Sequence, residues 1–189
     1  MRVRPSRGLA GGSRRPSRAW RRVLIAATAL ILVFGLVTAR LLIWPARGMP
    51  PRVDAIVMLA GPGDRLDLAQ QLARQQRAPV LVISRGWQGY GGPCPPKTAG
   101  VRLICFDPNP GNTRGEAEFA SRLAEHYGWR SIVLVTTPAQ DTRARILMGR
   151  CYSGSISVVT ASMPWDDWPY QIAYGWGALV KALVLHRAC

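Results

Sequence analysis

The sequence predicts an α/β protein: a doubly wound, mainly parallel sheet of about five strands, behind one N-terminal transmembrane helix. Two observations lead to this fold class. Short apolar runs alternate with helical patterns from Ala55 to His186, which is typical of parallel βαβ units. Ahead of them lies a long uncharged segment, Val23–Ala39, which is typical of a membrane span. The 189 residues leave room for one folded domain of ordinary size.

The N-terminal segment carries most of the chain's net positive charge. The net charge is +15, and residues 1–47 hold ten arginines and no acidic residue. Because this excess precedes an apolar segment, it is a poor indication of nucleic-acid binding, and we expect no nucleic-acid partner. Met1–Arg22 is rich in Arg, Gly, Ser and Pro and has no apolar periodicity. We therefore expect a basic, disordered tail over these residues.

Val23–Trp44 has the length of a transmembrane anchor, about 33 Å of helix. Trp20 and Trp44 flank it, as interfacial tryptophans do. Eight arginines precede the uncharged run Val23–Ala39 and three follow it, at Arg40, Arg47 and Arg52. We therefore expect a single-pass protein of the cell membrane with its N-terminus in the cytoplasm and its main domain outside. A cleaved signal peptide ending at Ala39 and twin-arginine export are the alternatives, and both also place the domain outside.

The predicted domain, residues 53–189, follows a Pro-rich linker at 45–52. Its first strand, Ala55–Leu59, leads through Gly61-Pro62-Gly63-Asp64 into a helix over Arg65–Arg77, which together form the front half of a βαβ unit. Such a turn directs backbone N–H groups and a helix N-terminus at one place, which suits an anion. A tight connection without a ligand is the alternative, because the turn has neither the dinucleotide pattern nor the P-loop pattern.

The remaining elements follow in one alternating series. We predict strands at Pro79–Ser84, Val101–Phe106, Ser131–Thr136 and Ser155–Val159, and helices at Arg114–Tyr127, Asp141–Arg150 and Pro169–His186. We expect the last helix to cover the sheet with its apolar residues and aromatic side chains buried. The alternative is that the aromatic residues contact a partner or the membrane; they are Trp165, Trp168, Tyr170, Tyr174 and Trp176.

The four cysteines are consistent with a domain outside the cytoplasm, where disulfides form. Cys94, Cys105, Cys151 and Cys189 lack C-x-x-C spacing, so zinc binding and thioredoxin-like chemistry are not expected, and we assign no metal site. An even number of cysteines in an exported domain favours two disulfides. We favour the pairs Cys94–Cys105, which would pin the loop Trp87–Gly100, and Cys151–Cys189, which would tie down the C-terminus. Buried free thiols are the alternative.

Polar residues follow the carboxyl ends of the predicted strands, where ligands of parallel sheets bind. Three arginines, several hydroxyls and two helix N-termini at this edge favour a phosphate-bearing or otherwise anionic ligand, although each arginine could also be surface decoration. The predicted ligand-binding residues are Gly61, Gly63, Arg65, Ser84, Asn112, Thr113, Arg114, Thr136, Thr137, Gln140 and Arg143.

Three segments in this order, DAIVMLAGPGDRLDLAQQLARQQRAPVLVISRG, NTRGEA and LVTTPAQDTRA, resemble the YdcF/SanA/ElyC family of bacterial envelope-associated proteins. The resemblance covers about Val53–Val159. It implies a Rossmann-like fold, often behind a membrane anchor, and an association with cell-envelope and peptidoglycan integrity. It also implies nucleotide-like ligand binding in some members, but it supplies no defined reaction, and we assign no cofactor.

The chain departs from the family pattern at several positions. Ala60-Gly61-Pro62-Gly63 replaces three glycines, Ser84-Arg85-Gly86 stands for Ser-Gly-Gly, and Glu116 comes one place later than the family's carboxylate. Ala139-Gln140 stands where the family has Tyr-His, and Gln does not titrate near neutral pH.

Three hypotheses on function therefore stay open. One is an enzyme acting on a phosphate-containing, lipid-linked precursor, with Glu116 or Asp64 as general base; the others are a ligand-binding protein without turnover and an interaction module. Both carboxylates also suit plain helix N-terminal roles, Asp64 as an N-cap and Glu116 as a first-turn acid.

Overall fold

The computed structural model describes residues 18–45, 48, 51–86 and 94–189. Our predictions for the tail before Arg18, for residues 46–47 and 49–50 of the linker, and for residues 87–93 of the following loop lie outside these described residues. The chain divides into two compact units, Met1–Val37 and Thr38–Cys189.

The N-terminal helix α1 spans Arg18–Thr38 and continues as the π-helix η1, Ala39–Ile43. These 26 residues form one helix that is long and apolar enough to cross a membrane. This agrees with the span predicted from the sequence. The second unit already begins at Thr38, within this helix. The last residues of the apolar helix, from Thr38 onward, therefore belong to the second unit.

Five parallel strands form a single sheet in the order β3-β2-β1-β4-β5. Their bounds are β1 Ala55–Met58, β2 Val80–Ser84, β3 Arg102–Phe106, β4 Ser131–Thr136 and β5 Ser155–Thr160. The order runs outward in both directions from the central pair β1 and β4, as it does in a doubly wound fold. The structure thus confirms the predicted α/β fold class, a Rossmann-like parallel sheet with one long apolar helix at its N-terminal end.

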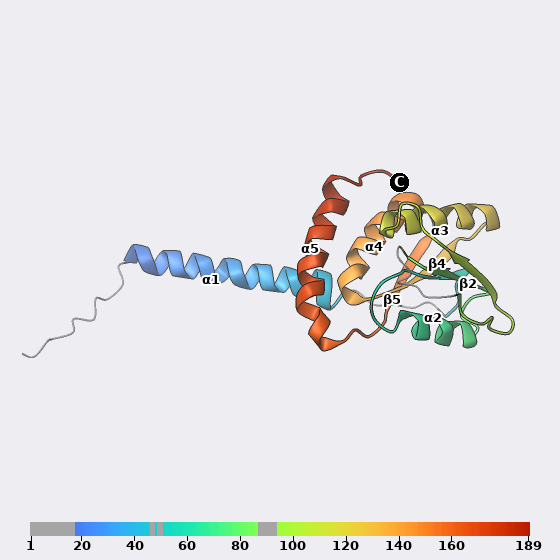
Figure 1. Ribbon diagram of the computed structural model, residues 1–189. Helices are drawn as coiled ribbons and strands as arrows, with labels where there is room; N and C mark the ends of the chain where they lie inside the picture. The colour runs from blue at the N-terminus through green and yellow to red at the C-terminus, as the bar shows by residue number, and fades with distance from the viewer. Residues whose placement is uncertain (1–17, 46–47, 49–50, 87–93) are drawn as a thin grey trace, which may run out of the picture. The chain divides into compact units, whose positions relative to one another are not determined.

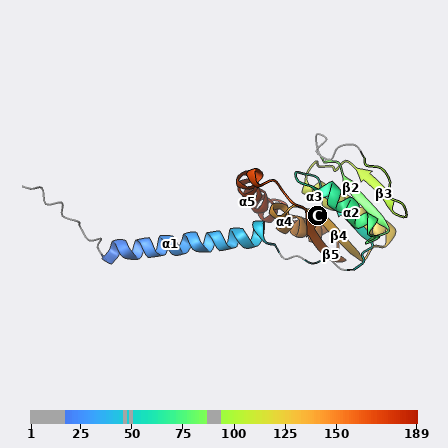
Figure 2. The same cartoon turned by 90° about the horizontal axis from the view of Figure 1, so that it is seen from below.

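Helices cover both faces of the sheet: α2 lies on one face, and α3 and α4 lie on the other (Figures 1 and 2). The bounds are α2 Arg65–Arg74, α3 Thr113–Tyr127 and α4 Pro138–Cys151. Successive side chains of a strand point to opposite faces, so Ile56 and Met58 of β1 join the α2 side of the core, whereas Ala55 and Val57 join the α3 and α4 side. This double burial explains why the strands read as continuous apolar runs.

Two helix boundaries differ from the prediction by three residues, each for a local reason. Helix α2 ends at Arg74 rather than Arg77, because Gln76 adopts a positive φ of 52° and breaks the helical path. Helix α4 begins at Pro138 rather than Asp141. Proline suits a first helical turn because the N–H groups there have no intrahelical partner. Gln140 therefore lies inside the helix and not in the loop before it.

The disulfides are Cys94–Cys105 and Cys151–Cys189, which confirms the favoured pairing. The first joins the loop before β3 to that strand. The second ties the C-terminal residue to the end of α4.

The last helix, α5 (Trp168–Val184), follows the short 3-10 helix η3 (Trp165–Asp167) and packs against α4 instead of the sheet (Figure 1). Leu179 is buried as expected, but Leu183 is 48% exposed and Trp165 is 85% exposed. The expectation of a sheet-covering helix with buried aromatic residues is therefore wrong. The physical reason is that α3 and α4 already cover this side of the sheet, which leaves α5 as an outer layer.

Candidate functional site

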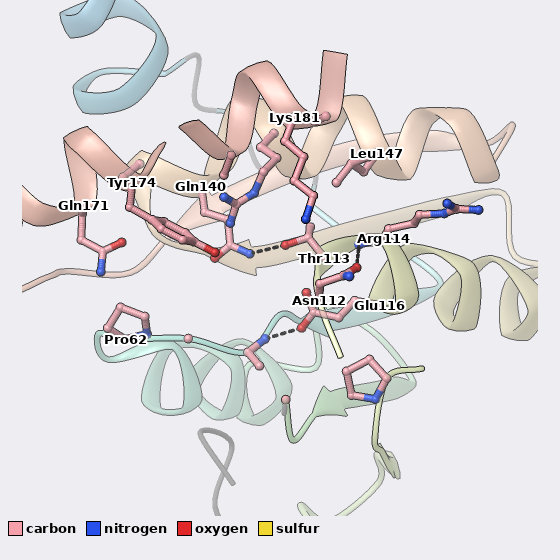
Figure 3. Close-up of a pocket in the computed structure, with 18 of the residues that line it drawn as sticks. Pro62, Asn112, Thr113, Arg114, Glu116, Gln140, Leu147, Gln171, Tyr174 and Lys181 are labelled. Carbon is pink, nitrogen blue, oxygen red and sulfur yellow. Dashed lines mark hydrogen bonds between the residues drawn. The ribbon is translucent and has the colours of Figure 1, made fainter. Parts of the chain in front are cut away.

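A cavity of about 590 Å³ opens where the carboxyl ends of β1 and β4 meet. This is the switch point of the sheet, since the connections after these two strands leave toward opposite faces. Three walls come from the turn after β1 and from the first turns of α3 and α4, and α5 supplies the fourth (Figure 3). The predicted residues that line the cavity are Gly61, Arg65, Asn112, Thr113, Arg114, Glu116, Gln140 and Arg143.

The glycine turn after β1 closes around the side chain of Arg65. Gly61 has a φ of 135°, and a Cβ there would lie 2.7 Å from the guanidinium of Arg65. Gly63 has a φ of 90°, and a Cβ there would lie 2.5 Å from the backbone oxygen of Ser162. Side chains rarely adopt such angles, so both glycines are needed for this path of the chain.

Arg65 is a structural cation, and its guanidinium holds the turn together. The side chain is only 2% exposed. Its Nε donates to the oxygen of Pro62 at 2.9 Å, and its Nη1 donates to the oxygens of Leu59 at 3.1 Å and Ala60 at 2.6 Å. Burial lowers the pKa of Arg65 to about 10, against the opposing effect of the Glu116 charge. The protein itself thus uses most of the donors that we assigned to a ligand.

Gln140 links Arg65 to α3. Its amide oxygen accepts from Arg65 Nη1 at 2.7 Å, and its amide nitrogen donates to the hydroxyl of Thr113 at 3.0 Å. The hydroxyl of Thr137 accepts from Arg65 Nη2 at 3.1 Å. The neutral amide offers an acceptor to one neighbour and a donor to the other at the same time. Gln140 therefore serves as a fixed cross-link between two walls of the cavity.

Glu116 occupies the backbone donor that the turn after β1 would offer to an anion. The carboxyl group is 2% exposed, and its Oε1 accepts from the N–H of Ala60 at 2.6 Å. Burial raises the pKa of Glu116, while the Ala60 hydrogen bond, the Ser84 hydroxyl and the charges of Arg65 and Arg143 oppose this rise. Glu116 therefore lines the cavity, and its raised pKa favours the protonated carboxyl group.

Arg143 has a guanidinium N–H group that can still donate a hydrogen bond. It lies on α4, one turn after Gln140, with its guanidinium carbon 5.4 Å from the centre of the Tyr174 ring. Its Nε is buried and has no hydrogen-bond partner. Burial lowers the pKa of Arg143, against the effects of the neighbouring Tyr174 and Glu116. A buried N–H without a partner costs free energy until an acceptor arrives.

Two further predicted ligand residues have local roles. Asn112 caps α3, with its side-chain oxygen accepting from the N–H groups of Arg114 at 2.9 Å and Gly115 at 3.2 Å. Arg114 pairs with Glu118 one turn further along α3, at 2.8 Å, and its side chain extends away from the centre of the cavity (Figure 3). The N-terminus of α3 is therefore capped by the protein's own side chain.

Asp64 does not share the cavity with Glu116. Its carboxylate accepts from the hydroxyl of Ser162 at 2.6 Å and makes no side-chain bond to the start of α2. The turn after β1 carries Asp64 toward α2 and away from the cavity wall. We therefore withdraw it as a general base. Four other predicted ligand residues also lie outside the cavity wall, namely Gly63, Ser84, Thr136 and Thr137.

Helix α5 contributes residues that the sequence analysis did not include. Tyr174 and Lys181 extend from α5 toward the opposite wall formed by Gln140 and Thr113 (Figure 3). The lining residues from η3 and α5 are Asp167, Tyr170, Gln171, Tyr174, Ala178, Lys181, Ala182 and His186. Their spacing of three and four residues marks one face of a helix. That periodicity is the signal that could have identified them, but only the fold shows that this face meets the strand ends.

Comparisons with protein-family models, with curated proteins and with solved structures find no match for this chain. The assignment to the YdcF/SanA/ElyC family therefore stays a prediction.

Proposed function

We propose that this is a single-pass cell-membrane protein whose extracytoplasmic domain binds an anionic, phosphate-bearing ligand in the cavity between α3, α4 and α5. The observation that carries the proposal is the buried, unpartnered Nε of Arg143 in the cavity wall. A guanidinium matches the planar, bidentate geometry of phosphate and carboxylate oxygens better than any other side chain does.

The charges around the cavity support an anion over a cation. Arg65, Arg143 and Lys181 all line the cavity and each carries a positive charge. Glu116 and Asp167 are the acidic lining residues, and burial disfavours the negative charge of Glu116. The described lining residues therefore carry a positive excess.

The environment of Gln140 favours binding without turnover. The family resemblance implies a histidine at this position, and here an amide that cannot titrate is fixed by two hydrogen bonds. Together with the membrane span and the two disulfides, the same resemblance supports a role in cell-envelope or peptidoglycan precursor metabolism.

Hydrolysis or transfer on the same ligand is a second candidate function. It is favoured by Glu116, which lines the cavity with a raised pKa, as a general base working near neutral pH would.

Ligand-induced thermal stabilisation of the full chain in detergent tests the binding proposal. The panel comprises polyprenyl phosphates, nucleotide sugars, nucleotides and S-adenosylmethionine. A ligand at about 100 times its dissociation constant adds about 2.7 kcal/mol, which is a rise of several degrees for a domain of this size. We expect this rise with a phosphate compound and expect Arg143→Gln to abolish it. Arg74→Gln, at an exposed position on α2, is the matched control and should retain it.

The outcomes separate the hypotheses. A rise that Arg143→Gln leaves intact, or no rise with any phosphate compound, overturns the anion-binding proposal. Turnover of the bound compound that disappears in Glu116→Gln, while the thermal rise persists, selects the enzyme over the binding protein.

A further inference from the structure

Helix α5 presents two different faces. One face lines the cavity through Tyr174 and Lys181. The opposite side carries residues 173, 176, 177, 180, 183 and 184, whose spacing follows one stripe along a helix. We call these residues, Ala173, Trp176, Gly177, Val180, Leu183 and Val184, the α5 stripe. Val180 and Val184 are each 53% exposed and Leu183 is 48% exposed, so the C-terminal part of the stripe is an uncovered apolar surface on a folded domain.

The α5 stripe is bonded directly to the end of the apolar N-terminal helix. The indole nitrogen of Trp176 donates to the hydroxyl of Thr38 at 3.2 Å. Leu42 packs under α5, where its side chain lies 3.3 Å from the position a Cβ on Gly175 would take. The hydroxyl of Thr142 on α4 donates to the oxygen of Leu41 at 2.6 Å. These contacts lie within the second unit, Thr38–Cys189.

A residue count places this contact at the depth of a bilayer surface. A hydrocarbon core of about 30 Å takes up about 20 helical residues. Counted from Val23, the first residue after Arg22, this length ends near Leu42. Thr38 lies before that point, so Trp176 must reach the outer edge of the bilayer when the helix spans it. Tryptophan is the residue most typical of this interface.

The charges beside the α5 stripe suit a lipid surface. From Trp168 to the C-terminus the chain has no acidic residue; of its basic residues, Lys181 and His186 line the cavity and Arg187 follows the helix. Arg40 is exposed at the end of the apolar helix. Basic residues next to an apolar helix face favour anionic headgroups and are typical of helices that lie in the membrane interface.

We infer that α5 lies on the outer leaflet of the bilayer that the N-terminal helix spans, with the α5 stripe against the lipid. This inference rests on the anchor in the proposed function. It places the anion-binding cavity one helix diameter, about 10–12 Å, above the lipid surface.

Photocrosslinking of the full chain in vesicles of phosphatidylcholine and phosphatidylglycerol tests this placement. Benzoylphenylalanine replaces one residue at a time: Val180 or Val184 in the stripe, Leu32 within the apolar helix, and Tyr127, a 41% exposed residue at the end of α3. We expect lipid adducts at 180 and 184 within severalfold of the yield at 32, and background yield at 127. A Val184→Glu change should lower the yield at 180 severalfold, because a charge opposes interfacial burial.

Each outcome has a separate meaning. Lipid adducts at 32 with background yield at 180 and 184 overturn the docking of α5 and leave the anchor intact. Background yield at 32 contradicts the anchor itself. Adducts at 180 that join two copies of the chain in place of lipid show that the stripe is a protein interface and also overturn the inference. The anion-binding proposal is judged separately by the thermal shift with Arg143→Gln.

Discussion

At the scale of single residues, the side chains of Arg65 and Gln140 hold the cavity together through hydrogen bonds to other parts of the protein. Arg65 and Gln140 share one hydrogen bond, and each bonds to a further wall of the cavity. Leaving a buried donor or acceptor unpaired costs about 1–3 kcal/mol. The two residues therefore fix one another and keep the cavity preformed, and in the proposed function Arg143 and Lys181 are the cations that engage the ligand.

The pH dependence of stability should report the burial of Glu116. Burial raises its pKa above the ordinary value of 4.5, so the folded protein binds this proton more tightly than the unfolded chain does. The corresponding stability is fully present below about pH 4.5 and is lost as the pH rises through the raised pKa. One pH unit between the folded and unfolded pKa values corresponds to about 1.4 kcal/mol.

Glu116→Gln keeps an acceptor for the N–H of Ala60 but cannot ionise. We expect the melting temperature of the wild type, relative to this variant, to fall as the pH rises above about 4.5. Glu125→Gln, at an exposed position on the same helix, controls for the loss of one surface charge. A difference between wild type and Glu116→Gln that stays constant over this range would contradict the assignment.

At the scale of elements, the turn after β1 and the start of α4 together place the site. The positive φ angles of Gly61 and Gly63 bring the turn over the end of β4, and Pro138 starts α4 early enough to carry Gln140 and Arg143 into the wall. The strand itself ends at Met58, so the geometry of the site is set by these connections more than by the sheet.

A change of Gly63→Ala tests the turn. The added Cβ would lie 2.5 Å from the backbone oxygen of Ser162, at a φ of 90°. We expect a loss of about 1–3 kcal/mol in the free energy of unfolding, measured by urea denaturation. Gly149→Ala on α4 is the control: its Cβ would meet Ile156 at an ordinary 3.9 Å, and alanine should raise helix stability by about 0.5–1 kcal/mol. Equal effects in both variants would show that the turn is not strained.

At the scale of the whole molecule, the two disulfides fix two segments outside the sheet, the loop before β3 and the segment after α5. Cys151–Cys189 joins residues 38 positions apart and retains the segment that follows α5. Cys94–Cys105 closes a loop of 11 positions beside β3, an edge strand of the sheet. Both are compatible with a domain outside the cytoplasm.

Reduction should destabilise the domain and loosen its C-terminus first. Closing a loop of this length with a disulfide is worth about 2–4 kcal/mol. We expect a double change of Cys151→Ser and Cys189→Ser to lower the free energy of unfolding by that amount in denaturant titrations.

The redox state of the cysteines tests the compartment of the domain. In protein isolated from its native membrane without reductant, maleimide should label none of the four cysteines. Labelling of all four would mean that the domain resides in a reducing compartment.

The sequence alone determined the features that depend on local patterns. Apolar periodicity predicted the strands, α2 to α4 and the long N-terminal helix, because a helix and a buried strand repeat over distances that a short window contains. The strand ends predicted where the candidate residues gather, and Gly61, Arg65, Glu116, Gln140 and Arg143 do line one cavity there.

Only the tertiary structure decided how these residues are used. Whether Arg65 bonds to a ligand or to Leu59 and Gln140 depends on contacts between residues up to 75 positions apart. The same holds for α5, whose sequence suits burial against a sheet and whose actual place depends on the space left by α3 and α4. Local propensity sets which elements form, whereas competition for surface sets which face each element presents, and no single segment of sequence contains that competition.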